Sequence, residues 1–238
     1  MTIGVVPGNV RPGGCGPIAN ACDKRTFVLL WAMTKGSDTR DRILREAESL
    51  AGTVGLDGLT IGVLAATLDL SKSGLFAHFG SREGLQLAVL QRAADRFDTD
   101  VLFPALRAKS GEPRLRALTD HWLAWERTRG AHGGDLLAAA AFEMDDRPGV
   151  VRDYLVRIQQ RWLATLATAC IIAAELGHFR GDLDADAWVR EAHGIVLAHR
   201  VARRLLGDHH ADDRARRTLD ELVARARATI KPRKRRAA

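Results

Sequence analysis

The residues with the clearest chemical potential lie in the run Thr60–Leu85, where small, polar and basic side chains alternate with apolar ones. Leu75 and Phe79 are four residues apart, so they share one face of a helix. The opposite face is small and polar and begins with Lys72. Hydrogen-bonding groups and positive charge on one helix face are the chemistry that binds the bases and phosphates of nucleic acid.

Three capping signals predict the elements that would hold this face in place. Thr60, Ser71 and Ser81 are N-cap types, and each stands directly before a run with helical spacing. Asp69 falls between the first two runs, and Asp is one of the few residues that tolerate left-handed backbone angles. Gly80, before the third cap, is a helix stop signal. The sequence therefore predicts a helix-turn-helix, an arrangement that lays its second helix in a DNA groove.

The same residues resemble the DNA-binding domain of the TetR family of bacterial transcriptional regulators, whose pattern is matched without a gap by TIGVLAATLDLSKSGLFAHFGSREGL. Upstream, the run Thr39–Ala47 is similar to the family's first helix, and the run Gly55–Thr60 is similar to the junction after it. The resemblance implies an N-terminal three-helix helix-turn-helix domain over residues 39–84.

The resemblance also implies which residues contact DNA. Thr60 and Ser71 would cap helices and offer hydroxyls or amides to phosphates, and Arg82 would contact a phosphate. The residues implied to face the major groove or its walls are Lys72, Ser73, Gly74, Ala77 and His78.

Two positions depart from the family pattern. Phe76 belongs to the implied DNA-binding set, but the family more often has Tyr there, so a hydroxyl that commonly reaches a phosphate is absent. Asp69 replaces the usual turn glycine and places a negative charge near DNA.

The charge of the chain is unevenly spread. The whole sequence carries +7 and has a pI near 9.9, but the run 39–80 is close to neutral. Its charged residues are Arg40, Arg42, Arg45 and Lys72 against Asp41, Glu46, Glu48, Asp57 and Asp69. Most of the excess lies near the C-terminus, where residues 230–238 are predicted to form a solvated, disordered basic tail or a non-specific nucleic-acid contact.

The rest of the chain is predicted to be all-α. No alternating strand pattern persists, and breaks with Gly or Pro separate segments rich in Ala, Leu and Arg. The breaks predict helices near 81–108, 112–129, 134–145, 149–176, 184–206 and 211–229. We expect Pro104 to bend or end the first of them. The resemblance implies that residues 85–229 form a regulatory and dimerisation domain.

One of these helices carries a wide apolar stripe. Its members at spacings of three and four are Trp188, Ala192, Ile195, Val196, His199 and Ala202. In the family the last two helices pair with those of a second subunit, so the resemblance implies a homodimer through 184–206 and 211–229. Such a dimer would read a near-palindromic, double-stranded operator. The alternative is that both helices pack only within one subunit.

The resemblance further implies a cavity for a small-molecule effector. The large aromatic candidates for its lining are Trp122, Trp125, Phe142 and Trp162, and the candidates for its polar groups are His121, Glu126, Glu143 and Asp146. Aromatic residues at helical spacing are also ordinary core residues, so each keeps that alternative. The chemistry of the effector is not readable from the sequence.

Motifs of other chemistry are missing or weak. The sequence has no P-loop, no GxGxxG after a strand, no GxSxG and no HExxH, so we expect no catalytic residue, cofactor or metal. The cluster Asp208–Asp213 contains possible metal ligands, but its carboxylates are more simply helix caps. Cys170 stands among apolar residues as a buried side chain or, alternatively, a thiol sensor. The alternative function is a helical-bundle enzyme or a metal or redox sensor.

The leader, residues 1–38, is rich in Gly and Pro and precedes the first expected helix. We expect it to be disordered, or Met33 to be the native start; the rival is an arm in which Arg11, Lys24 and Arg25 touch DNA. The sequence shows no signal peptide or membrane span, which favours the cytoplasm. Together these features predict a TetR-like homodimeric repressor whose effector shifts the helix over 81–108 and so releases a palindromic operator.

Overall fold

A computed structural model describes the backbone of residues 24–127 and 135–228, with side chains from residue 39 onward. Residue contacts divide the chain into two units, Met1–Thr39 and Arg40–Ala238. In the first unit only the helical backbone from Lys24 is described, so the site lies entirely in the second unit. The predicted disordered run 1–23 and the basic tail 230–238 lie outside the described residues, as do the side chains of Lys24 and Arg25.

Helix α1, Lys24–Gly58, begins inside the predicted leader rather than at Thr39. The run 24–33 contains no Gly or Pro, and the backbone over 24–38 is helical, whereas the sequence analysis expects a disordered leader or a native start at Met33. Near its other end α1 kinks at Gly55, whose φ of 78° and ψ of 165° lie outside the helical range.

The predicted helix-turn-helix is present as α2, Ile61–Leu68, and α3, Lys72–Phe79, followed by α4, Arg82–Phe97. All three predicted caps form: the hydroxyls of Thr60, Ser71 and Ser81 accept a hydrogen bond from the amide three residues on, at 3.1, 3.1 and 2.9 Å. Asp69 has φ 51° and ψ 45°, the left-handed conformation that the turn requires. We call α1 from Arg40, α2, α3 and the first turn of α4 the head.

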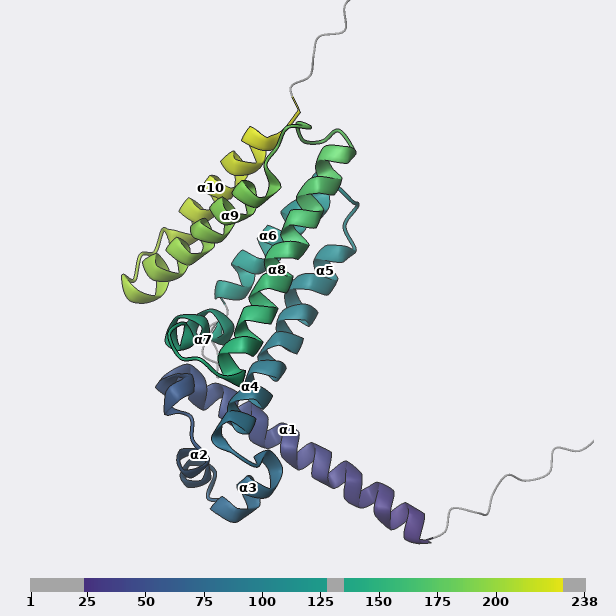
Figure 1. Cartoon of the computed structure of the whole chain (residues 1–238), viewed down its shortest axis with the longest axis vertical. Helices are drawn as coiled ribbons and strands as arrows, with labels where there is room; N and C mark the ends of the chain where they lie inside the picture. Colours follow the sequence, from purple (N-terminus) through teal and green to yellow (C-terminus); the bar gives the residue numbers. More distant parts are fainter. Residues whose placement is uncertain (1–23, 128–134, 229–238) are drawn as a thin grey trace, which may run out of the picture. The chain divides into compact units, whose positions relative to one another are not determined.

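The remaining helices form the body, as Figure 1 shows. They are α5 Phe103–Leu106, α6 Glu112–Arg127, α7 Leu136–Met144, α8 Val150–Glu175, α9 Ala185–Arg200 and α10 Ala211–Ala226. Helices α6 and α8 lie beside α4 and α5, and α9 and α10 form a pair against α6 and α8 (Figure 1). These bounds agree with the predicted helices to within a few residues at each end.

Pro104 interrupts the predicted helix over 81–108. Before it, the π-helical turn η1, Asp98–Leu102, joins α4 to α5, and the Phe103 amide bonds to the Asp98 carbonyl five residues earlier. Because Pro has no amide hydrogen and its ring crowds the preceding turn, a straight α-helix is unfavourable here. A second π-helical turn, η2 at Val201–Leu205, extends α9.

The all-α fold class is confirmed. In the described part of the chain the one strand-like pairing is an isolated antiparallel bridge between Phe179 and Arg227. No helix within residues 24–127 and 135–228 is long and apolar enough to cross a membrane.

Helix α4 positions both parts of the site because its buried face belongs to the head and to the body. Leu85 at its start is fully buried near the caps, and Phe97 at its end packs among aromatic side chains of α6 and α8. A shift of α4 therefore moves residues at both ends.

Candidate DNA interface and ligand pocket

Helix α3 presents the polar face that the sequence predicts. Leu75 and Phe79 are buried and hold the helix on the head. The residues of the predicted DNA-binding set that are exposed on this helix and at its cap are Ser71, Lys72, Ser73, Gly74, Phe76, Ala77 and His78. Phe76 is 58% exposed, so an aromatic ring stands in solvent on the face that would meet DNA. Thr60 is half-buried at the start of α2.

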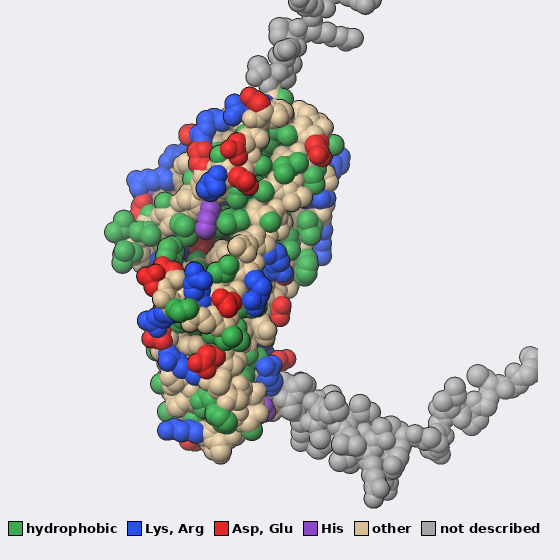
Figure 2. Space-filling view, in the orientation of Figure 1, with side chains coloured by type: hydrophobic (Ala, Val, Ile, Leu, Met, Phe, Trp, Pro, Cys, Tyr) green, Lys and Arg blue, Asp and Glu red, His purple; other side chains and the backbone are tan. Residues whose placement is uncertain are grey.

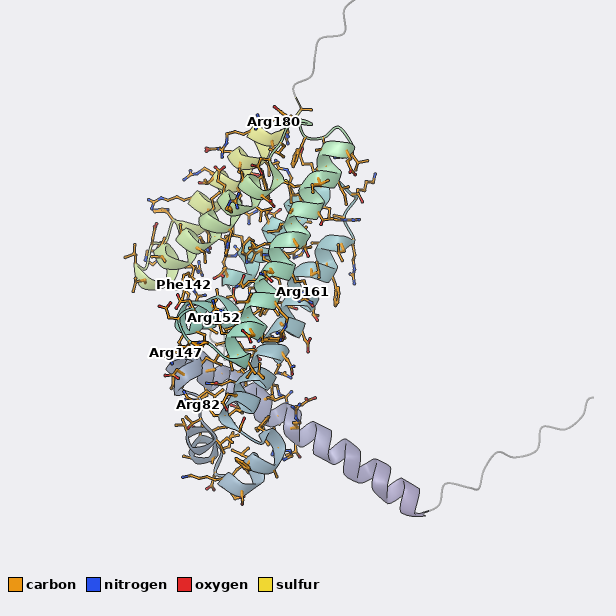
Figure 3. The ribbon with its side chains drawn as sticks, in the orientation of Figure 1. Arg82, Phe142, Arg147, Arg152, Arg161 and Arg180 are labelled. Carbon is orange, nitrogen blue, oxygen red and sulfur yellow. The ribbon has the colours of Figure 1, made fainter. Side chains whose placement is uncertain are left out.

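Arg82, which the sequence analysis expects to contact a phosphate, pairs with Asp57 in the structure. Its guanidinium donates to the carboxylate and the carbonyl oxygen of Asp57, and Arg147 from the body pairs with the same carboxylate at 2.8 Å. Figure 3 labels both arginines, which lie near each other where head and body meet. The two guanidinium groups hold the pKa of Asp57 below its ordinary value. Arg82 is thus paired within the protein, with 42% of its side chain exposed.

The head is also less acidic at its surface than its sequence suggests. Glu48 is buried, and it pairs with Arg92 at 3.3 Å and with Arg96 at 2.5 Å, both from α4. With Asp57 also paired, two of the acidic residues counted against DNA binding are neutralised by arginines outside the run 39–80. The sequence contains these arginines but does not reveal the pairing.

A pocket lies in the body between α4, α6, α7, α8 and α9. The pocket is open to solvent on one side, and its empty volume, counted together with that opening, is about 610 Å³. The centre of a water molecule can occupy about 40 Å³ of this volume. Its walls are largely apolar, and the polar groups that line it are Asp98, Glu126, Asp135, Gln159, Arg161, Thr165 and His193. A mostly apolar pocket with a few polar groups is typical of small-molecule sites.

Two of the four predicted aromatic residues line this pocket, namely Trp122 and Trp162. Trp125 does not line it but is buried against Phe97, with ring centroids 5.6 Å apart. Phe142, labelled in Figure 3, is 60% exposed and is not among the residues that line this pocket. Helical spacing does not reveal which side of a short Ala-rich helix faces inward.

Of the predicted polar candidates, only Glu126 lines the pocket, whereas His121, Glu143 and Asp146 do not. The sequence analysis missed Phe97, Asp135 and His193. The sequence contains one signal for Asp135, because this residue stands directly before an apolar run, as N-cap residues often do. In the structure Asp135 caps α7.

Glu126 and Asp135 form a buried acidic pair, with 3% and 5% of their surfaces exposed. The pKa of Glu126 is raised to about 9, first by burial and then by the charge of Asp135 and a hydrogen bond with it, while the charges of Arg200 and Arg204 act in the opposite direction. Arg200 lies 3.5 Å from the Glu126 carboxylate and donates at 3.1 Å to the Asp135 carbonyl oxygen. Burial lowers the pKa of His193, which stacks on Trp122.

Helix α7 connects the pocket to the head. At its start, Asp135 accepts hydrogen bonds from the amides of Leu137 and Ala138, at 2.9 and 3.2 Å. Near its end, Glu143 accepts hydrogen bonds from the amides of Leu56 and Asp57, at 2.8 and 2.6 Å.

The kink at Gly55 makes the contact with Glu143 possible. A β-carbon at Gly55 would lie only 2.9 Å from a carboxylate oxygen of Glu143, and the positive φ favours glycine in any case. The end of α1 is therefore shaped to receive a side chain from α7.

The predicted apolar stripe of α9 mainly faces its own subunit, since Trp188, Ala192, Val196 and His199 are buried. A second face, which the sequence analysis missed, is exposed and consists of small or apolar residues: Gly194, Ala198, Val201 and Leu205. Figure 2 shows hydrophobic side chains gathered at the end of the α9–α10 pair, where Leu205 and Leu206 are 79% and 72% exposed.

The predicted alternatives of a thiol sensor at Cys170 and a metal site in Asp208–Asp213 concern residues whose contacts the structure shows. Burial raises the pKa of the Cys170 thiol to about 12, which disfavours the reactive thiolate that a redox sensor uses. Asp208 pairs with Arg214, and Asp212 pairs with Arg203 and with the buried His199 at 2.7 Å. No cluster of three or more metal-ligating side chains occurs among the described residues.

Two family models match the sequence of the chain. The model for bacterial regulatory proteins of the tetR family matches residues 43–89, and the model for the tetracyclin repressor-like C-terminal domain matches residues 111–219. The fold and the site thus define a DNA-binding transcriptional regulator with a helical C-terminal domain. Because the two matches cover more than half of the sequence, the chain belongs to the TetR family, whose members are DNA-binding regulators and not enzymes.

Solved structures share the fold at low sequence identity. A TetR transcriptional regulator from Chloroflexus aurantiacus J-10-FL has a TM-score of 0.75 at 23% identity, covering 82% of this chain and 100% of that one. A TetR family regulator from Cytophaga hutchinsonii has a TM-score of 0.72 at 16% identity, with 82% and 98% covered. A transcriptional regulator from Saccharomonospora viridis in complex with choline has a TM-score of 0.65 at 22% identity, with 79% and 96% covered. No curated protein sequence matches the chain.

Proposed function

We propose that this regulator is a cytoplasmic homodimeric repressor, released from a near-palindromic operator by a small molecule that binds the body pocket. The observation that carries the proposal is that two walls of the pocket, α4 and α7, also hold the head. Ala94 and Phe97 of α4 line the pocket, and Asp135, which lines it too, caps α7. A ligand that displaces either helix therefore displaces the head.

Operator recognition falls to the exposed face of α3 in this proposal. Lys72 and His78 would approach base edges or phosphates. The hydroxyl oxygens of Thr60 and Ser71 accept hydrogen bonds from helix amides, so each hydroxyl hydrogen would be free to be donated to a phosphate. Arg82 would contribute by fixing α4 to Asp57 rather than by touching DNA. The domain limits that we propose remain 39–84 for DNA binding and 85–229 for regulation.

Dimerisation through 184–206 and 211–229 would use the second face of α9. Gly194 and Ala198 let helix backbones approach closely, and Val201 and Leu205 add apolar area beside them. The exposed side of α10 is instead strongly charged. We therefore expect α9 to supply most of the apolar contact with the second subunit, and the two heads to meet successive major grooves.

Effector release would work through the two helices that the pocket and head share. The sequence-based mechanism assigns the shift to the helix over 81–108, and the structure adds α7 as a second connection. Because a packed helix moves as a unit, displacement of its pocket end changes the position of its other end. The solved regulator from Saccharomonospora viridis in complex with choline supports the idea that this fold accepts a small molecule.

Selection of bound sequences from random double-stranded DNA tests the proposal, using the full chain at moderate salt. Recovery of a near-palindrome, together with a dimer mass by light scattering, is the expected result. A lack of sequence preference, or a monomer bound to a single half-site, would contradict it.

A further inference from the structure

The interior of the pocket combines aromatic rings with buried acid. Phe97 and Trp162 pack edge to face with centroids 4.8 Å apart at 86°, and Trp122 meets Trp162 at 5.3 Å and 80°. All three residues line the pocket. Aromatic faces attract cations, most strongly where water is excluded.

The charges around the pocket leave the acidic pair only partly balanced. Asp98 and Arg161 pair with each other at 2.9 Å. Arg200 lies 3.5 Å from the Glu126 carboxylate, which is a long separation, and it also donates to the Asp135 carbonyl oxygen. Arg204 acts on Glu126 electrostatically, more weakly than Arg200, and His193 is favoured in its neutral form by burial. In the described part of the chain, the charges of Arg200 and Arg204 therefore offset the burial of Glu126 and the charge of Asp135 only in part.

One side chain that lines the pocket, Trp162, also carries a donor without an acceptor. The indole N–H of Trp162 is buried and has no hydrogen-bond partner among the described residues. A buried donor without an acceptor is costly, so a ligand that brings an acceptor would gain from this group.

We propose that the pocket binds a small organic cation, a quaternary or protonated amine, whose charge lies against Glu126 and Asp135 and the rings of Trp122 and Trp162. A hydroxyl or carbonyl oxygen on the same ligand accepts a hydrogen bond from Trp162. The proposal names the chemical class of the effector, and it rests on the proposed function only for its regulatory consequence.

Binding of the cation is coupled to loss of a proton. Because the pKa of Glu126 is raised to about 9, its carboxyl group carries a proton at neutral pH in the free protein. A bound cation favours the carboxylate, so the Glu126 O–H bond breaks and the proton passes to solvent. Affinity for the cation therefore rises with pH between about 6 and 8, by at most about tenfold per pH unit.

Three ligands of similar shape and different charge test the inference: choline, the neutral 3,3-dimethylbutan-1-ol and the anionic 3,3-dimethylbutanoate. Titration of the full chain, followed by tryptophan fluorescence and by calorimetry in buffers of different ionisation heat, is expected to give tightest binding for choline with release of about one proton. The neutral alcohol is expected to bind at least about tenfold more weakly. Equal or tighter binding of the alcohol or the anion, or no binding of choline and tetramethylammonium at millimolar concentration, overturns the inference.

Two variants assign the effect to residues. Glu126→Gln is expected to weaken choline about tenfold or more and to abolish proton release, whereas the same change at the exposed Glu175 leaves both unchanged. Trp162→Phe is expected to reduce the preference for choline over tetramethylammonium, which lacks the hydroxyl. Proton release that persists in Glu126→Gln, or an unchanged preference in Trp162→Phe, contradicts the assignment.

Operator binding separates this inference from the proposed function. If choline binds with proton release but leaves affinity for the selected operator unchanged, the cation site stands and effector release fails. If a neutral or anionic molecule releases the operator while choline does not bind, effector release stands and the cation site fails.

Discussion

At the scale of single residues, Asp69 is the residue of the head that departs most clearly from expectation, since the family usually has glycine at this turn. It adopts left-handed angles, where most side chains are strained, and its backbone amide bonds to the Ala65 carbonyl oxygen. The side chain is exposed at the turn before the face that would meet DNA. It therefore combines a small conformational cost with an unfavourable charge.

Replacement of Asp69 separates these two effects. Asp69→Gly is expected to keep the fold, stabilise it by up to about 1 kcal/mol and tighten operator binding modestly. Asp69→Asn removes the charge but keeps the side chain, so it should tighten binding without much change in stability. Measurement of urea unfolding and operator affinity checks both variants, and weaker binding of either would mean that the carboxylate contributes to recognition.

The salt dependence of binding distinguishes Lys72 from Arg82. Lys72 is exposed on α3, and Lys72→Ala is expected to reduce the slope of log affinity against log salt by about one unit. Arg82 is paired with Asp57, so Arg82→Ala is expected to lower stability and change the slope less. If both variants change the slope equally, Arg82 leaves Asp57 to reach a phosphate on DNA.

The raised pKa of Glu126 predicts how stability depends on pH. Between its ordinary value of 4.5 and its folded value of about 9, the folded protein holds a proton that the unfolded chain has released. The stability associated with that proton is present below pH 4.5 and is lost as pH rises through 9. We expect the free energy of unfolding to fall between pH 7 and pH 9, by at most about 1.4 kcal/mol per pH unit.

Two other groups with shifted pKa values, His193 and Glu112, change charge outside this window. The pKa of His193 is lowered from 6.5, and Arg227 holds the pKa of Glu112 at about 2. Glu126→Gln should therefore flatten the profile between pH 7 and pH 9. A profile that keeps its slope in this variant would assign the proton to another group.

At the scale of elements, α7 is the short helix with the most consequential contacts. Its first turn borders the pocket, and its Glu143 accepts hydrogen bonds from two amides that follow Gly55, where the non-helical backbone angles interrupt the hydrogen bonds of α1. Loss of an acceptor at such a place leaves backbone donors without a partner.

Glu143→Ala is expected to expose the amides of Leu56 and Asp57, with a loss of about 1–3 kcal/mol in stability. Hydrogen exchange measured residue by residue should show faster exchange at these two amides than in the wild type. Asp146→Asn is the matched control, because Asp146 is an exposed carboxylate close to the same helix end. Unchanged exchange at Leu56 in the Glu143 variant would remove α7 from the connection.

At the scale of the whole molecule, DNA affinity is expected to depend on two heads held together. Each head has a nearly neutral sequence, and two linked heads bind a palindrome far more tightly than one head binds a half-site. We propose that this linkage depends on the exposed face of α9.

Ala198→Glu is expected to break the dimer, because it places a charge on the small, exposed face of α9. Operator affinity should fall on the order of a hundredfold while the monomer stays folded. Leu176→Glu, at an exposed position after α8, is the control and should remain dimeric. A dimer that survives the Ala198 change would assign the interface to another face.

Much of this architecture is local, and the sequence determined it. Thr60, Ser71 and Ser81 cap helices through bonds to amides three residues away, and Asp69 turns the chain by its own backbone angles. Helix positions, the all-α class and the family followed from such short-range features. Short-range signals are readable because the residues that interact are neighbours along the chain.

Only the tertiary structure decided which distant side chains meet. In the structure Arg82 pairs with Asp57, and Glu48 is buried against α4. Phe142 is exposed, and Glu126 lies beside Asp135 and the tryptophans of the pocket. Each of these outcomes depends on how helices pack and which face each one buries, and periodicity alone leaves that choice open when a helix is short or apolar on more than one side. The sequence by itself therefore determined the kind of protein, whereas packing decided the pocket's chemistry and its connection to the head.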